Sequence, residues 1–304
     1  MLAINYLRQT TAGGAAMDRG TSCRILVCLL LLAGLLLQPS CSSEFVYNRV
    51  DRIAQFYIKR YVDLDRDQSQ FLKVNLESIK QWHRREELQG YRDFLNTVES
   101  DLQQDISGAT VAGWVDYLRQ AYNDIRDKVL PPMIEVAGTL TTAQVEELAA
   151  NMEKRNREQE KEYLTRDDTE YRKSAFDEMD DRLSGWLGRL TTEQKQRLQS
   201  AVSGLERLDR QWLDGRRAWQ KQVIGELQRQ PGWQARLTAL VNNRSEYTQA
   251  RDIAANHRNE QRIYAAVADV LNMRTDRQRR KLLEKLHDYQ KDLAALQNYP
   301  HRSG

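Results

Sequence analysis

The chain has 304 residues, of which 29% are charged and 40% are hydrophobic, and its formal net charge is +3. Basic and acidic residues are interspersed, which excludes the basic excess expected of a nucleic-acid-binding protein. The cysteines are Cys23, Cys28 and Cys41, so the chain beyond residue 41 has no thiol for a disulfide, a metal site or a nucleophile.

The amino terminus has the composition of an export leader. Residues 25–37 read ILVCLLLLAGLLL, follow Arg19 and Arg24, and precede a polar segment that contains Cys41. This run is shorter than the ~20 apolar residues that a membrane-spanning helix needs, so we interpret it as the apolar part of a signal peptide. The residues before Met17 add nothing to such a leader. We therefore assign 1–16 to an overlong gene start and 17–40 to a lipoprotein signal peptide.

The end of this leader resembles the lipobox of bacterial lipoproteins, in which leucine and two small residues precede the cysteine. Ser40 fits that pattern, whereas Gln38 and Pro39 depart from it. The resemblance implies cleavage after Ser40, a palmitate-type lipid anchor on Cys41, and, because Ser42 is not aspartate, the periplasmic face of the outer membrane. Plain secretion and an uncleaved anchor are the alternatives.

The body of the chain has helical periodicity. Apolar residues recur at three- and four-residue steps over 46–61, over 72–102 with a bend near Gly90, and over 111–129. Pro131-Pro132 predicts the end of the third helix, and the segment 145–164 predicts an exposed helix or a projecting arm. Strand signals are lacking. We expect an all-α, elongated, antiparallel multi-helix bundle without β-sheet, a single domain over 41–300 with a sub-boundary left open near 131–140.

A repeated helix start is the most informative local pattern. Three segments have the form Leu-[Asp/Thr]-x-x-Gln, and a fourth has Arg274 in place of the leucine. In such a capping box the Asp or Thr side chain accepts from a backbone N–H of the first turn, and the Gln side chain reaches back to the cap residue. Weaker caps are predicted at Thr165 with Asp168 and at Ser245. The predicted cap residues are Leu64, Asp65, Gln68, Leu140, Thr141, Gln144, Leu190, Thr191, Gln194, Thr275 and Gln278.

The same pattern resembles the Leu-Thr-x-x-Gln motif of the small helical periplasmic proteins of the Spy and CpxP type. Residues 140–144 and 190–194 match it fully. The resemblance implies a chaperone or an envelope-stress modulator, although the body here is about twice as long.

A wider resemblance covers nearly the whole body. It is to an uncharacterised family of Gram-negative lipoproteins that is defined only as a domain of unknown function. The resemblance implies a helical architecture and an envelope location, and it supplies no activity. The segments that carry it are 47–49 (YNR), 61–68 (YVDLDRDQ), 82–85 (WHRR), 91–95 (YRDFL) and 186–194 (WLGRLTTEQ).

Three clusters of polar residues contain residue types that occur in metal or catalytic sites. Residues 63–67 begin like a calcium loop, but Gln68 and Val74 stand where glycine and glutamate are required. Glu284 and His287 have the Glu-x-x-His spacing of one half of a di-iron site, without a second copy. His83 lies in a run of charged residues, where a partner in an interhelical hydrogen bond is favoured over a catalytic or ligand-recognition role.

Two other features have an ordinary and a functional interpretation. The basic stretch 274–281 is either a solvated helix face or a contact for anionic lipid headgroups. The tryptophans are interpreted as core residues, with a partner-binding groove as the alternative. They are Trp82, Trp114, Trp186, Trp212, Trp219 and Trp233.

These patterns predict a protein without enzymatic activity, cofactor, metal or nucleic-acid partner. We expect an outer-membrane-anchored lipoprotein whose body binds or scaffolds an envelope protein or a cell-wall polymer. The alternative function is a periplasmic chaperone or an envelope-stress modulator.

Overall fold

The computed structural model describes residues 47–298, and over this range the chain is all-α, as the periodicity predicts. The elements are α4 (Val50–Lys59), α5 (Arg66–Glu86), α6 (Leu88–Asp101), α7 (Gly108–Thr139), α8 (Thr142–Gln159), the π-helical turn η1 (Glu160–Leu164), α9 (Asp168–Leu187), α10 (Thr192–Ser203), α11 (Asp209–Glu226), α12 (Trp233–Asn242), the 3₁₀ turn η2 (Arg244–Tyr247), α13 (Ala250–Asn272) and α14 (Asp276–Gln297).

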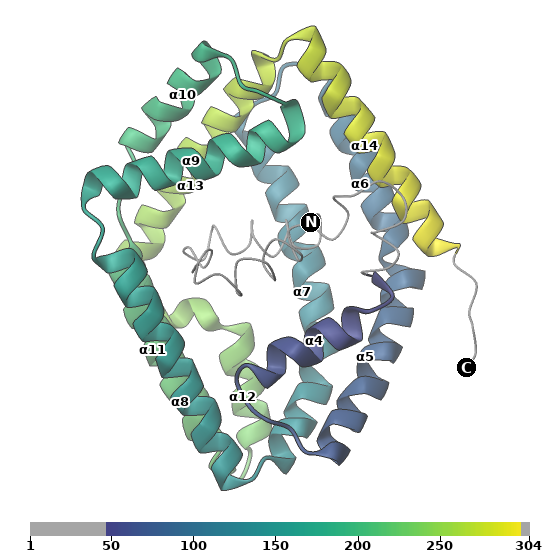
Figure 1. The fold of residues 1–304 in the computed structure, drawn as a ribbon, viewed down its shortest axis with the longest axis vertical. Coiled ribbons are helices and arrows are strands. Elements are labelled where there is room, and N and C mark those ends of the chain that lie inside the picture. The colour runs from purple at the N-terminus through teal and green to yellow at the C-terminus, as the bar shows by residue number, and fades with distance from the viewer. Residues whose placement is uncertain (1–46, 299–304) are drawn as a thin grey trace.

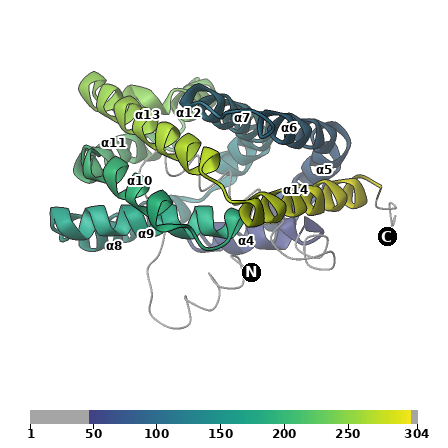
Figure 2. The same cartoon turned by 90° about the horizontal axis from the view of Figure 1, so that it is seen from above.

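The helices follow the edges of a diamond in the view down the shortest axis (Figure 1). Helix α5 lies along one edge, α6 and α14 along the next, α9, α10 and α13 along the third, and α8 and α11 along the last. Helix α7 runs through the middle of this view from near the top to the bottom, and α12 lies inside the outline. Contacts between α6 and α14 and between α7 and α13 join early and late parts of the chain. Helix α4 lies on one broad face of the molecule, as the view from above shows (Figure 2).

The two larger clusters of buried apolar residues lie toward opposite ends of the molecule. The large core contains Leu198 and Ala201 from α10 and Leu286 from α14. The small core contains Leu72 and Trp233 from α5 and α12. Helix α7 contributes to both, because its first half supplies residues 111 and 115 to the large core and its last turns supply residue 136 to the small core. A single long helix therefore connects the two cores.

The predicted helix end at Pro131-Pro132 is wrong, because α7 continues through both prolines to Thr139. A proline inside a helix removes a ladder hydrogen bond and crowds the preceding turn. Here the turns that follow are anchored by apolar burial, since Pro132 and Val136 are buried and Val136 and Leu140 belong to the small core. Tertiary packing overrides the local penalty.

Three further local predictions differ from the structure. Helix α9 is capped by Asp167 with Glu170, two residues away from the predicted Thr165. Ser245 lies inside η2, and α13 begins after Gln249 without a side-chain cap. The break predicted near Gly90 falls at Glu87, between α5 and α6.

The segment 145–164 is not a projecting arm. Helix α8 packs against α11, and Asn156 in its last turn is almost fully buried. Its apolar positions are few because part of that interface is made of hydrogen-bonded polar side chains. Apolar periodicity does not reveal a helix interface that is made of polar side chains.

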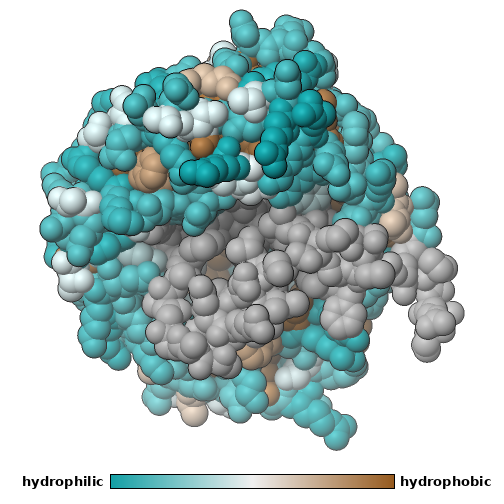
Figure 3. All heavy atoms as spheres, turned by 45° about the horizontal axis from the view of Figure 1, so that its top comes forward, coloured by the Kyte–Doolittle hydropathy of each residue, from teal (hydrophilic) through white to brown (hydrophobic). Residues whose placement is uncertain are grey.

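The part of the surface that the structure describes is mainly hydrophilic on the face shown, with scattered apolar residues (Figure 3). Among residues 47–298, no helix combines the length and the apolar character that crossing a membrane requires.

Candidate functional site

All four Leu/Arg-[Asp/Thr]-x-x-Gln segments form capping boxes in the structure. Asp65, Thr141, Thr191 and Thr275 each accept a hydrogen bond from the backbone N–H three residues on. They begin α5, α8, α10 and α14, respectively. Tertiary structure adds a relation that the sequence does not reveal, because the four glutamines meet in two pairs.

Gln68 and Gln144 form the first pair, which we call the first joint. Each side-chain amide donates to the other's Oε1, at 3.2 Å from Gln68 and 2.8 Å from Gln144. The remaining N–H of Gln68 donates to the carbonyl of Thr139, and that of Gln144 donates to the carbonyl of Asp63. Two helix starts and two chain turns are thereby hydrogen-bonded to one another.

Gln194 and Gln278 form the second pair, which we call the second joint. Their reciprocal amide hydrogen bonds measure 3.0 and 2.9 Å. Gln194 also donates to the carbonyl of Val270, and Gln278 donates to the carbonyl of Arg189. Gln194 has no exposed surface and Gln278 is 4% exposed, so this joint is buried.

Each amide in the joints uses its whole hydrogen-bonding capacity. A glutamine offers two donors and two acceptor lone pairs. In both joints, each Oε1 accepts from its own cap residue's N–H and from the partner amide, while each Nε2 donates to the partner amide and to a carbonyl. A network that is fully satisfied in this way fixes a single arrangement of the helices around it.

The joints lie where the chain turns at opposite ends of the long axis. The turn from α7 to α8 is at the bottom of the diamond, and the turn from α13 to α14 is at its top (Figure 1). Leu140 and Leu190 are buried beside the joints, in the small and large cores, respectively, and Leu64 packs against the small core. At the fourth cap, Arg274 instead donates to the carbonyls of Leu271 and Leu102, which ties α6 to the second joint.

A second polar cluster surrounds His83 at the junction of α4, α5 and α6. Nδ1 of His83 lies 3.0 Å from the Tyr47 hydroxyl, and Nε2 lies 3.2 Å from the Tyr91 hydroxyl. Nearby, Arg84 donates to the Asn48 side chain at 2.9 Å. His83 is thus a partner in interhelical hydrogen bonds.

Burial determines the protonation of this cluster. Desolvation lowers the pKa of His83 to about 4, which keeps the imidazole neutral at physiological pH. Desolvation also raises the pKa of Tyr47 to about 12 and that of Tyr91 further still. All three groups are therefore neutral, and their chemistry at neutral pH is hydrogen bonding.

The interface between α8 and α11 contains a third polar group. Arg216 Nε donates to Asn156 Oδ1 at 2.7 Å, and Asn156 Nδ2 donates to Gln220 Oε1 at 2.6 Å. Desolvation lowers the pKa of Arg216. Sequence reasoning missed these residues, since single polar side chains on charged helices give no signal that they are buried.

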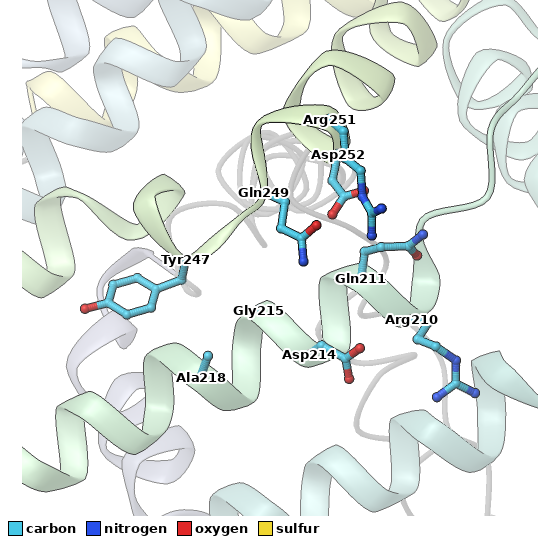
Figure 4. Close-up of a pocket in the computed structure, with 9 residues that line it drawn as sticks. All are labelled: Arg210, Gln211, Asp214, Gly215, Ala218, Tyr247, Gln249, Arg251 and Asp252. Atoms are coloured by element: carbon cyan, nitrogen blue, oxygen red, sulfur yellow. The ribbon is translucent and has the colours of Figure 1, made fainter.

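A polar pocket of about 350 Å³ lies between α11 and the start of α13. Its walls include Arg210 and Asp214 from α11 and Arg251 and Asp252 from α13, so the charges of its lining balance (Figure 4). Helix α11 approaches η2 so closely here that a Cβ on Gly215 would lie 2.8 Å from the backbone oxygen of Tyr247.

The remaining sequence-predicted residues have structural roles or lie outside the described residues. Cys41 is outside the described residues. His287 lies 3.0 Å from Glu99 of α6, and no group of three or more His, Cys, Asp or Glu side chains in residues 47–298 is placed to hold a metal ion. Trp233 is buried, whereas Trp114, Trp186 and Trp219 pack partly buried against the cores.

The fold is all-helical, and paired helix caps hold its two ends. The chain belongs to a family of unknown function, DUF6279, whose model matches residues 60–252. The match includes the first joint and Gln194, and it ends within α13, before the fourth cap. Comparison with curated proteins and with solved structures gave no match.

Proposed function

We propose that this protein is a lipid-anchored protein of the cell envelope whose rigid helical body binds or scaffolds another envelope component without catalysing a reaction. The observation that carries the scaffolding role is the pair of glutamine joints. They fix both ends of a body in which α6 contacts α14 and α7 contacts α13. A body of this kind can hold a partner at a defined distance from its anchor.

The anchor is supported by the leader that ends at Cys41. We propose that the lipid on Cys41 places the body on the periplasmic face of the outer membrane. Radioactive palmitate supplied to cells is expected to label the protein, and Cys41→Ala should abolish the label. Cys28→Ala is the matched control, because it alters a leader cysteine and should leave labelling unchanged. Equal labelling of both variants would show that the lipid is not on Cys41.

The binding role can be tested at the polar pocket. A photo-crosslinking amino acid in place of Gln211, on the pocket wall, is expected to capture a discrete envelope component in intact cells. The same amino acid in place of Lys173, an exposed side chain of α9, serves as the control. Identical products from both positions would contradict recognition at the pocket.

The alternative function, a chaperone or a stress modulator, was suggested by the Leu-Thr-x-x-Gln segments. In the structure Gln144 pairs with Gln68 and Gln194 pairs with Gln278, which accounts for the motif without a client protein. An aggregation-suppression assay separates the two functions. We expect no protection of an unfolding client at equimolar ratio, and protection would favour the chaperone.

A further inference from the structure

Helix α4 is held at both of its ends by polar contacts to other helices. Before its first turn, Tyr47 and Asn48 are hydrogen-bonded to His83 and Arg84 of α5. After its last turn, the carbonyl of Tyr61 accepts from Asn151 of α8 at 3.0 Å. Helix α4 therefore crosses one broad face of the molecule between two edges of the diamond (Figures 1 and 2).

The middle of α4 presents aromatic residues to solvent. Phe56 is 50% exposed and Tyr57 is 38% exposed, and their rings meet edge to face at 6.0 Å. No residue of α4 is buried, although the helix is strongly amphipathic and packs on α5. Exposed aromatic side chains on an amphipathic helix are typical of a surface that contacts a partner or a membrane interface.

Basic residues surround these rings. Arg52, Phe56 and Lys59 follow at steps of four and three residues and so share a stripe of the helix. The guanidinium of Arg60 lies 6.0 Å from the Tyr57 ring. Lys59 lies 3.6 Å from Asp63, in an ion pair in which both side chains remain largely exposed. Residues 49–63 contain four basic and two acidic side chains.

The position of α4 in the chain identifies the partner. Val50 follows Cys41 by nine residues, and nine extended residues span about 30 Å at most. A lipid on Cys41 would therefore keep Val50, the first residue of α4, within about 30 Å of the bilayer surface. Basic and aromatic residues so close to a bilayer match the charge of anionic phospholipids and the mixed polarity of the headgroup layer.

We propose that the exposed face of α4 docks on the anionic phospholipid surface that holds the anchor, with Phe56 and Tyr57 in the headgroup layer and Arg52, Lys59 and Arg60 near the phosphates. This inference rests on the lipid anchor proposed above. It orients the body, because α4 is fastened to α5 and α8 and carries them with it.

The test uses the lipidated full chain added to preformed vesicles. Phe56→Cys supplies the single free thiol, since Cys41 is acylated and Cys23 and Cys28 leave with the leader. We expect a membrane-impermeant maleimide to label this thiol about fivefold or more slowly on vesicles with phosphatidylglycerol than on phosphatidylcholine vesicles. Ile253→Cys, on α13 and 46% exposed in the parent, is the matched control and should be labelled equally on both.

A charge reversal locates the contact. Arg52→Glu added to Phe56→Cys is expected to restore rapid labelling on anionic vesicles. Arg277→Glu, an exposed residue in the basic stretch of α14, should leave labelling slow. If Arg277→Glu restores labelling and Arg52→Glu does not, the lipid contact belongs to α14 and the proposal is wrong.

The remaining outcomes separate the docking of α4 from the anchor. A lipidated chain that floats with anionic vesicles while positions 56 and 253 react equally would overturn the docking and leave the anchor in place. A chain that carries no lipid and does not float would overturn both. If labelling at position 56 slows as more protein is bound per vesicle, and does not depend on the fraction of anionic lipid, a second copy of the chain covers α4. That result would overturn the docking.

Discussion

The cap glutamines show how one side chain can serve two levels of structure. Gln194 completes the cap of α10 through its Oε1, and the same amide pairs with Gln278 and donates to the carbonyl of Val270. Local capping alone is worth about 1 kcal/mol. The buried contact adds the cost of leaving donors and acceptors without partners if the side chain is changed.

Replacing Gln194 with glutamate tests this double role with almost no change in shape. Gln194→Glu removes both amide donors and buries a carboxylate beside Gln278 Oε1. We expect the free energy of unfolding to fall by roughly 3–5 kcal/mol at neutral pH, as for other uncompensated buried charges. Gln249→Glu, at the exposed start of α13, should change it by about 0.5 kcal/mol or less. Guanidinium unfolding measures both, and similar losses would contradict the role of the joint.

His83 predicts a pH dependence of stability. Its pKa is about 4 in the folded chain and near 6.5 when unfolded, so the unfolded chain binds more protons between these values. The contribution of the neutral imidazole is complete above pH 6.5 and is lost as the pH falls toward 4, by about 3 kcal/mol. His83→Gln should therefore lose less stability than the parent between pH 7 and pH 4. Parallel losses in urea titrations would show that His83 does not cause the dependence.

At the scale of elements, α7 shows packing overriding local preference. Its two prolines do not end the helix, because the turns beyond them are buried in the small core. Its cap, Ser107 with Thr110, also lacks the Glu or Gln by which a capping box is usually found in a sequence. The sequence therefore misplaced the end of the longest helix described and gave no signal for its start.

Pro131 is exposed, so its effect on α7 can be measured without disturbing the core. Pro131→Ala restores a backbone donor to the ladder and relieves the crowding of the preceding turn. We expect the free energy of unfolding to rise by about 1–3 kcal/mol. Glu135→Ala, also exposed on α7, should have little effect. A loss of stability on Pro131→Ala would mean that α7 needs its local geometry at this position.

At the scale of the whole molecule, the two cores are expected to unfold together. Helix α7 contributes Val115 to the large core and Val136 to the small core. Leu198 and Leu72 lie at the centres of these cores, with 0% and 1% exposure. Leu198→Ala and Leu72→Ala should each cost about 2–5 kcal/mol.

If α7 couples the cores, either substitution lowers the midpoint of one common thermal transition. Circular dichroism follows the transition, and hydrogen exchange should accelerate at both joints in either variant. Two separate transitions, each shifted by only one of the substitutions, would show that the cores are independent.

Much of the fold was predictable because it depends on patterns of residues that are close together in the sequence. Apolar recurrence predicted an all-α chain, and Asp65, Thr141, Thr191 and Thr275 predicted four helix starts that the structure contains. The candidate sites were less accessible to prediction. The sequence indicates that His83 is a hydrogen-bond partner, but it does not identify Tyr47 and Tyr91 as the residues that it contacts. No sequence motif marks the pocket beside Gly215.

By itself, the sequence determined the helical class and the four capping boxes, because each depends on residues close together in the chain. Tertiary structure decided that the caps meet in pairs, since Gln68 and Gln144 are 76 residues apart and Gln194 and Gln278 are 84 apart. It also decided that α7 passes its prolines and that α4 presents Phe56 to solvent. Those outcomes depend on burial and on which helices are neighbours, and these are properties of the packed chain.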